Sequence, residues 1–239
     1  MKIAIFGDSF AAPLHDSKTD VGLKSWVDYL SEKYDITNYA VEGSSLYYSV
    51  SQFMTFNYPY DKIIFVTTSP GRLYLSGNTI LEKHRHTHLS SLSYAEFIYN
   101  ENKNKTDPES IEITKTAQAV IQYFTYIQRT AYDKFIHDLQ IEHIKKIRPD
   151  IIIIPAFRIH HHVKSLSPCL YDITEMENTH WGIPLNYGSP DDSRRCHMSK
   201  ENNLILAGIA ERWLQGEPVN ININDFVIPA DDKSFYNIK

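Results

Sequence analysis

Residues 3–10 read Ile-Ala-Ile-Phe-Gly-Asp-Ser-Phe, and this stretch decides how the rest of the chain is interpreted. The apolar run Ile3–Phe6 is short and stops at Gly7, which predicts a buried β-strand followed by a sharp turn. Two polar residues, Asp8 and Ser9, come directly after it. This arrangement is typical of a simple turn, and equally of a nucleophile mounted at the end of a strand. The remaining sequence is needed to distinguish these two interpretations.

Further apolar runs alternate with helical patterns along the chain. Strands are predicted at residues 3–6, 35–40, 61–66 and 150–155, and helices at 22–34, after the turn at 41–45, at 110–148 with a break near Tyr132, and at 199–214. Strands that alternate with helices favour a mostly parallel sheet covered on both faces. The run at 150–155 is apolar on both sides, which is typical of a central strand. We therefore expect an α/β fold, a three-layer α/β/α sandwich with a short parallel sheet, as a single domain over 1–239.

Two segments depart from this alternation. Residues 73–108 are polar and irregular, and we interpret them as an insertion after the third strand. Residues 216–239 have no helical pattern and are expected to form an extended tail. Ser199 is the expected N-cap of the last helix. The residues expected to face inward from that helix are Leu204, Ile205, Ala207 and Gly208.

Composition narrows the class of protein. The chain has 239 residues, is 42% hydrophobic and carries a net charge of −5, so it can bury a full core and is not expected to bind nucleic acid. Its two cysteines, Cys169 and Cys196, imply no disulfide framework. The N-terminus lacks the pattern of a signal peptide, and no run approaches the roughly 20 apolar residues of a membrane span. We expect a soluble, cytoplasmic protein with no membrane partner.

Polar residues follow three of the predicted strands: Gly7-Asp8-Ser9, Gly43-Ser44 and Thr67–Arg72. The carboxyl ends of parallel strands share one edge of the sheet, where such folds place their sites. His197 precedes the last helix, whose start can return to the same edge. A serine nucleophile needs a base, usually histidine, to accept its proton, and N–H donors for the oxyanion. The turn interpretation of Ser9 therefore becomes weaker than the nucleophile interpretation.

These blocks resemble the SGNH/GDSL hydrolase superfamily, in the same order and over residues 3–214. The G-D-S block of that family matches Gly7-Asp8-Ser9, its glycine turn is similar to Asn38–Gly43, and its H-[LM]-S before a helix is similar to His197-Met198-Ser199. The last pattern also resembles SGNH-like proteins predicted in phage genomes. The resemblance implies an SGNH/flavodoxin-like fold with Ser9 as nucleophile, His197 as base and the Gly43 N–H group as an oxyanion donor.

The chain departs from the third block of that family, G-x-N-D, whose asparagine donates to the oxyanion. Residues 67–72 read Thr-Thr-Ser-Pro-Gly-Arg and contain no asparagine. Ser69 or Arg72 is expected to replace this donor, or the oxyanion is held by backbone groups alone. Arg72 can alternatively anchor a loop, or bind a substrate carboxylate or phosphate through its planar fork.

A second departure concerns the carboxylate of the family's D-x-x-H block. The residue three before His197 is Arg194 instead of an aspartate. The carboxylate that orients the imidazole is then Asp192 or Asp191, or the protein uses a Ser–His dyad. Asp8 is expected to bond to the backbone of its own turn.

The expected function is a serine esterase that removes a small O-acyl group from a carbohydrate without a cofactor, the oligomeric state being undetermined. The competing class is an SGNH-like binding or structural module that has lost catalysis. A nucleotide-binding protein is disfavoured because residues 7–12, Gly-Asp-Ser-Phe-Ala-Ala, match neither the Walker A motif nor the G-x-G-x-x-G motif of dinucleotide-binding folds. Alternate histidines at 84–88 and the triplet at 160–162 complete no familiar ligand spacing, so no metal is expected.

Overall fold

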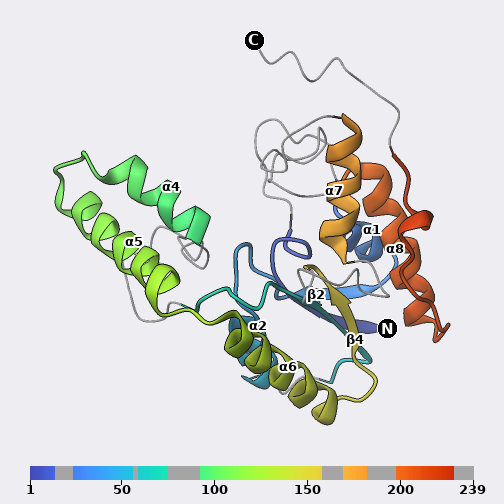
Figure 1. The fold of residues 1–239 in the computed structure, drawn as a ribbon. Coiled ribbons are helices and arrows are strands. Elements are labelled where there is room, and N and C mark those ends of the chain that lie inside the picture. Colours follow the sequence, from blue (N-terminus) through green and yellow to red (C-terminus); the bar gives the residue numbers. More distant parts are fainter. Residues whose placement is uncertain (14–23, 56–58, 75–91, 158–168, 182–197, 229–239) are drawn as a thin grey trace.

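Four parallel strands form a sheet at the centre of the fold (Figure 1). They are β1 (Lys2–Phe6), β2 (Asp35–Asn38), β3 (Lys62–Thr67) and β4 (Ile152–Pro155), in the order β2-β1-β3-β4. The computed structural model describes residues 1–13, 24–55, 59–74, 92–157, 169–181 and 198–228. The predicted parallel α/β sandwich is confirmed over this part of the chain.

Helices cover both faces of the sheet. The described helices are α1 (Trp26–Ser31), α2 (Leu46–Thr55), α4 (Leu92–Asn102), α5 (Pro108–Tyr126), α6 (Thr130–Ile147), α7 (Leu170–Trp181) and α8 (Lys200–Leu214), of which α4 and α5 do not lie on the sheet. The turn η2 (Ile223–Asp225) is a short 3₁₀ helix. Successive side chains of a strand point to opposite faces. Ile3 and Ile5 of β1 therefore pack with α1 and α8, while Ala4 and Phe6 pack with α2 and α6.

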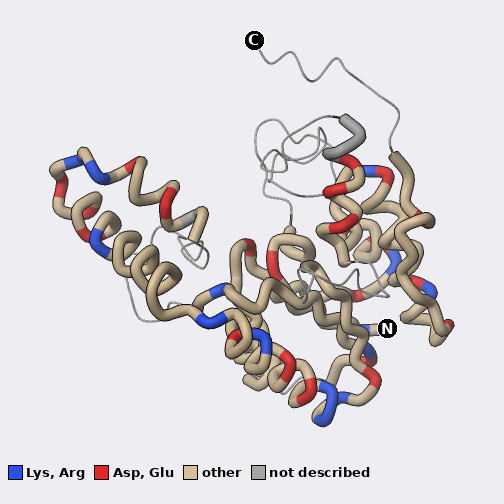
Figure 2. Tube along the Cα trace, in the orientation of Figure 1, with Lys and Arg blue, Asp and Glu red and all other residues tan. Residues whose placement is uncertain are grey.

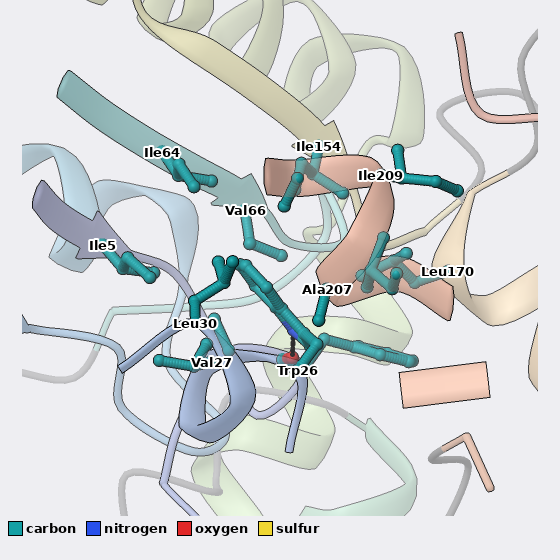
Figure 3. Close-up of a cluster of buried hydrophobic side chains, with 14 of the residues drawn as sticks. Ile5, Trp26, Val27, Leu30, Ile64, Val66, Ile154, Leu170, Ala207 and Ile209 are labelled. Atoms are coloured by element: carbon teal, nitrogen blue, oxygen red, sulfur yellow. Dashed lines mark hydrogen bonds between the residues drawn. The ribbon is translucent and has the colours of Figure 1, made fainter. Parts of the chain in front are cut away.

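Trp26 is the centre of the larger core (Figure 3). It is fully buried at the first position of α1, among side chains from the strands and from α8. Its indole Nε1 donates to the backbone oxygen of Phe10 at 2.7 Å, so this large ring is buried without an unsatisfied donor. α1 starts here because Ser25 and Asp28 form a capping box in front of the apolar face.

The strand β4 lies at the edge of the described sheet, so its predicted central place was wrong. Its residues are apolar on both sides because both faces are covered by helices. Ile154 packs into the core under α1 and α8, while Ile153 packs into the core under α2 and α6. An apolar run thus indicates two covered faces, but not two neighbouring strands.

The segment expected to be irregular, 73–108, contains the helix α4. This helix pairs with α5 in a hairpin that stands away from the sheet (Figure 1). The hairpin has its own small core, in which Ala95 and Ile98 of α4 meet Ala117 of α5. The polar stretch that suggested irregularity is the connection after α4, where Asp107 caps the start of α5.

The long helical pattern at 110–148 breaks at residues 127–129, earlier than the expected break at Tyr132. Gln128 lies in this break, where its amide donates to the backbone oxygen of Gly71 at 3.4 Å and to Asp133 at 2.8 Å. The break therefore returns the chain from the hairpin to the loop after β3. Beyond it, α6 carries interleaved acidic and basic residues (Figure 2).

The helix α8 starts after Ser199, which is its N-cap as predicted. Its buried face differs from the expectation, because Leu204 is 55% exposed and Gly208 is exposed as well. The residues that α8 buries are Asn202, Asn203, Leu206, Ala207, Ile209, Ala210 and Leu214. Two asparagines on the buried face hid this periodicity, because a pattern of apolar residues does not count them.

The tail after α8 packs on the core through Ile221 and Phe226, with the turn η2 between them. Asn202 fixes this segment by exchanging two hydrogen bonds with the backbone of Val227, at 2.8 and 2.9 Å. Residues 229–239 of the predicted extended tail lie outside the described residues. Among the helices described, none combines the length and apolar character that crossing a bilayer requires.

We predict that Gly7→Ala destabilises the fold by about 2 kcal/mol or more. Gly7 has a φ of +156°, and an added Cβ would lie 2.7 Å from Cβ of Val66. Gly208→Ala is the matched control, because nothing lies within 4 Å of its added Cβ, and it should stabilise α8 by roughly 0.5–1 kcal/mol. Urea unfolding measures both. Equal effects of the two substitutions would contradict the tight packing at Gly7.

Candidate active site

The order of the strands creates a switch point between β1 and β3. The chain passes from β1 to β2 on one side, and later places β3 on the other side. In open α/β sheets, ligands bind at such a point, beyond the carboxyl ends of the strands. Ser9 follows β1 and Arg72 follows β3, so both lie at this position in the topology.

The turn after β1 is held by the residue before Ser9. The backbone oxygen of Asp8 accepts from the N–H groups of Ala11 and Ala12, at 3.0 and 2.9 Å. Its carboxylate Oδ1 accepts from the N–H group of Phe10 at 3.1 Å, which confirms the expected bond to the backbone of the turn. Ser9 is 6% exposed and is fixed between these contacts.

The other carboxylate oxygen of Asp8 forms an ion pair that the sequence did not predict. Oδ2 lies 3.1 Å from Nη1 of Arg72, and the side chain of Asp8 is fully buried. A buried carboxylate is costly unless it is paired and hydrogen-bonded. Asp8 meets both requirements, and the pair draws the loop after β3 onto the turn that carries Ser9.

The turn after β2 joins the same group of contacts. The hydroxyl of Ser44 donates to the backbone oxygen of Gly7 at 3.1 Å, and its own backbone oxygen accepts from Nη1 of Arg72 at 3.2 Å. Gly43 has a φ of +70°, a left-handed conformation that glycine adopts without strain. Asn38, the first residue of this block, donates to the backbone oxygen of Ala11 at 2.7 Å.

Arg72 is oriented on both sides. Its guanidinium carbon lies 5.0 Å from the centre of the Phe157 ring, which follows β4 and also packs edge-on against Phe10 at 5.5 Å. The backbone oxygen of Ser69 accepts from the Arg72 N–H group at 3.2 Å and closes the turn. Within the described residues, Nε and Nη2 of Arg72 donate no hydrogen bond, and the side chain is 16% exposed. The guanidinium is therefore held in place by Asp8, by the backbone of Ser44 and by the ring of Phe157.

A path of buried hydrogen bonds ties the turn after β1 to the start of α8. Trp26 donates to Phe10 through its indole and to Oδ1 of Asn203 through its backbone N–H, at 3.0 Å. The amide of Asn203 then donates to the backbone oxygens of Met198 and Ser199, each at 3.0 Å. The residue that directly follows His197 in the chain is thus linked, through two side chains, to the residue that directly follows Ser9.

Glu177 of α7 completes this path. Its carboxylate is fully buried and accepts from the N–H group of Ser199 at 3.1 Å, from the Ser199 hydroxyl at 2.5 Å, and from the amide of Asn202. Burial raises the pKa of Glu177 to about 7, against the opposing effect of these donors. A carboxylate at the N-terminus of α8 also complements the helix dipole.

Several predicted residues lie outside the described part of the chain. These are His197, Asp192 and Asp191, together with the histidines at 84–88 and 160–162 and Cys196. Cys169 is a free, buried thiol, and burial raises its pKa to about 12. No group of three or more His, Cys, Asp or Glu residues within the described residues is arranged to hold a metal ion.

Ser9, Gly43, Ser69 and Arg72 all belong to turns at the carboxyl ends of the strands, as the sequence predicted. Sequence reasoning missed Trp26 as a donor, Asn203 and Glu177. Asn203 was detectable only as a polar residue on a helix face that must be buried. No sequence pattern indicated a role for Glu177, because its partner Ser199 lies 22 residues away across a long connection.

No protein-family model matches the chain, and no curated protein matches it in sequence. Among solved structures, it is similar to a "putative lipolytic protein of G-D-S-L family" from Desulfitobacterium hafniense DCB-2. The two chains are 12% identical, the match covers 89% of this chain and 98% of that chain, and the TM-score is 0.35.

We predict that Arg72→Met lowers the free energy of unfolding by about 3–5 kcal/mol, because it leaves Asp8 buried and unpaired. The double variant Asp8→Asn/Arg72→Met should lose less than Arg72→Met alone, since no unpaired charge remains. Arg212→Met breaks the exposed ion pair with Glu217 and should cost less than about 1 kcal/mol. Chemical denaturation of the three variants measures these differences. A double variant less stable than Arg72→Met would rule out a charge penalty.

Glu177 should make stability depend on pH. Its pKa in the folded protein, about 7, lies above the ordinary value of 4.5. The contribution of Glu177 is therefore fully present below about pH 4.5 and is lost as the pH rises toward 7. Relative to Glu177→Gln, the wild type should lose unfolding free energy between pH 5 and 8, by an amount on the order of 2–3 kcal/mol. Urea titrations at four pH values test this, and parallel curves for the two proteins would contradict it.

Proposed function

We propose that the protein is a serine hydrolase that cleaves an ester, with Ser9 as the nucleophile and His197 as the general base. The observation that carries the proposal is the convergence of Ser9, the Gly43-Ser44 turn and Arg72 through the Asp8 ion pair at the switch point of the sheet. An isolated turn serine would not need the ends of three strands to be joined around it.

The reaction proceeds in two steps. The hydroxyl oxygen of Ser9 attacks the acyl carbonyl carbon, while the imidazole of His197 accepts the hydroxyl proton. The tetrahedral intermediate collapses by breaking the bond to the alcohol oxygen, which takes that proton from the imidazolium. Water then attacks the acyl-serine with His197 again as the base, and the carboxylic acid leaves as Ser9 regains its proton.

The oxyanion of the tetrahedral intermediate is stabilised by the N–H groups of Ser9 and Gly43 and by Arg72. Gly43 has no side chain and a left-handed backbone conformation, so its N–H group can come close to the oxyanion. In this proposal Arg72 takes the place of the family's asparagine donor, while its Nη1 is held by Asp8 and by the backbone oxygen of Ser44. One such donor contributes on the order of 3 kcal/mol in other hydrolases. Ser69 contributes by closing the turn that presents Arg72.

The contacts of Met198, the next residue in the chain, support the proposed role of His197. Met198 is 2% exposed and is bonded through Asn203 and Trp26 to Phe10, so the start of α8 is tied to the turn that carries Ser9. Asp192, or else Asp191, orients the imidazole of His197. If neither carboxylate does so, the protein uses a Ser9–His197 catalytic dyad. The substrate is a small O-acyl group on a carbohydrate.

The test is labelling by a fluorophosphonate probe, followed by intact-protein mass measurement. The wild type should gain one label, Ser9→Ala none, and His197→Ala at least tenfold less at equal time, because the hydroxyl then lacks its base. Ser31→Ala is the control, since this serine is exposed on α1 and should leave labelling unchanged. A folded wild type that takes no label would overturn the esterase and favour a binding module on the same scaffold.

A further inference from the structure

Three tyrosines gather beside the candidate active site. Tyr47 and Tyr48 lie in the first turn of α2, and Tyr74 lies in the loop after β3. The ring centres of Tyr47 and Tyr74 are 5.0 Å apart, and those of Tyr48 and Tyr74 are 6.1 Å apart. We refer to Tyr47, Tyr48 and Tyr74 as the tyrosine cluster.

The cluster is attached on both sides to the contacts around Ser9. Tyr47 comes three residues after Ser44, and Tyr74 comes two residues after Arg72. Ser44 and Arg72 are themselves bonded at 3.2 Å. The turn before α2 and the loop after β3 meet at this bond, and each leads within three residues into the cluster.

Two members of the cluster are exposed although the rings touch, and the third, Tyr48, is half-buried. Tyr47 is 52% exposed and Tyr74 is 43% exposed, which is far from the burial of a core aromatic. An exposed tyrosine offers a flat apolar ring together with a hydroxyl at its edge. Burial and the nearby Tyr74 raise the pKa of Tyr48, so its hydroxyl stays protonated at neutral pH and can donate or accept a hydrogen bond.

We propose that the tyrosine cluster is a binding subsite for a sugar ring, which it holds as the alcohol part of the ester. A pyranose matches this surface, because it has a face of C–H groups that can lie on an aromatic ring and hydroxyls at its rim that can bond to the tyrosine hydroxyls. An alkyl chain would make no use of those hydroxyls and would need an enclosed apolar wall. The kinetic part of this inference rests on the proposed esterase function.

The kinetic test compares two acetate esters that differ in the alcohol. One is a methyl glucopyranoside carrying a single O-acetyl group, and the other is ethyl acetate, which has no ring. Tyr47→Ala/Tyr74→Ala should lower kcat/KM about tenfold on the sugar ester and less than twofold on ethyl acetate. Tyr47→Phe/Tyr74→Phe should retain most of the activity, because it keeps the rings. Tyr126→Ala, an 81% exposed tyrosine on α5, is the control and should behave as the wild type.

An equal loss on both esters would show that the rings only support the fold, and an unchanged rate on the sugar ester would show that they do not contact the alcohol. Either result overturns the subsite.

A binding measurement on the Ser9→Ala protein tests the subsite without catalysis, so a failure of the subsite can be distinguished from a failure of the esterase. Saturation-transfer NMR with methyl glycosides of glucose, galactose, xylose and N-acetylglucosamine should detect binding of at least one of them to the Ser9→Ala protein. The signal should be lost in the triple variant Ser9→Ala/Tyr47→Ala/Tyr74→Ala. No signal from any glycoside would overturn the subsite whatever the catalytic result.

Discussion

The ion pair between Asp8 and Arg72 is the constraint on which the candidate site depends. A fully buried carboxylate directly before Ser9 needs a cationic partner, and Arg72 supplies it because the loop after β3 folds toward the end of β1. Arg72 then also reaches the backbone oxygen of Ser44 and the ring of Phe157. A single guanidinium thus joins the segments that follow all four strands, and each of those segments contributes to the surroundings of Ser9.

The second constraint joins the turn after β1 to the start of α8. Trp26 and Asn203 connect the residue after Ser9 to Met198 by buried hydrogen bonds, and Glu177 holds Ser199 from the other side. Buried polar groups of this kind have to be satisfied, because an unmade bond costs more than a made one contributes. Burial raises the pKa of the same carboxyl group to about 7, so the contacts at the start of α8 depend on pH near neutrality.

Local patterns were sufficient to predict most of the architecture. The four strands, the cap at Ser199 and the placement of Ser9, Gly43 and Arg72 at strand ends follow from short apolar runs and the turn residues that stop them. The edge position of β4 was not predictable, because an apolar run records covered faces and not neighbouring strands. The pairing of Asp8 with Arg72, 64 residues apart, and of Glu177 with Ser199 depends on tertiary contacts that no local pattern contains. The helix α4 was missed because its apolar residues serve a separate small core in the hairpin.

One measurement tests most directly whether Ser9 is the reactive centre of a preformed site. It is the crystal structure of the protein after treatment with diethyl 4-nitrophenyl phosphate, which phosphorylates an activated serine and releases 4-nitrophenolate. We expect a diethylphosphoryl group on the Ser9 oxygen, with its phosphoryl oxygen within hydrogen-bond distance of the Gly43 N–H group or the Arg72 guanidinium, and with the Asp8–Arg72 pair intact. An unmodified Ser9 in a folded protein, or a phosphoryl oxygen turned away from both donors, would contradict it.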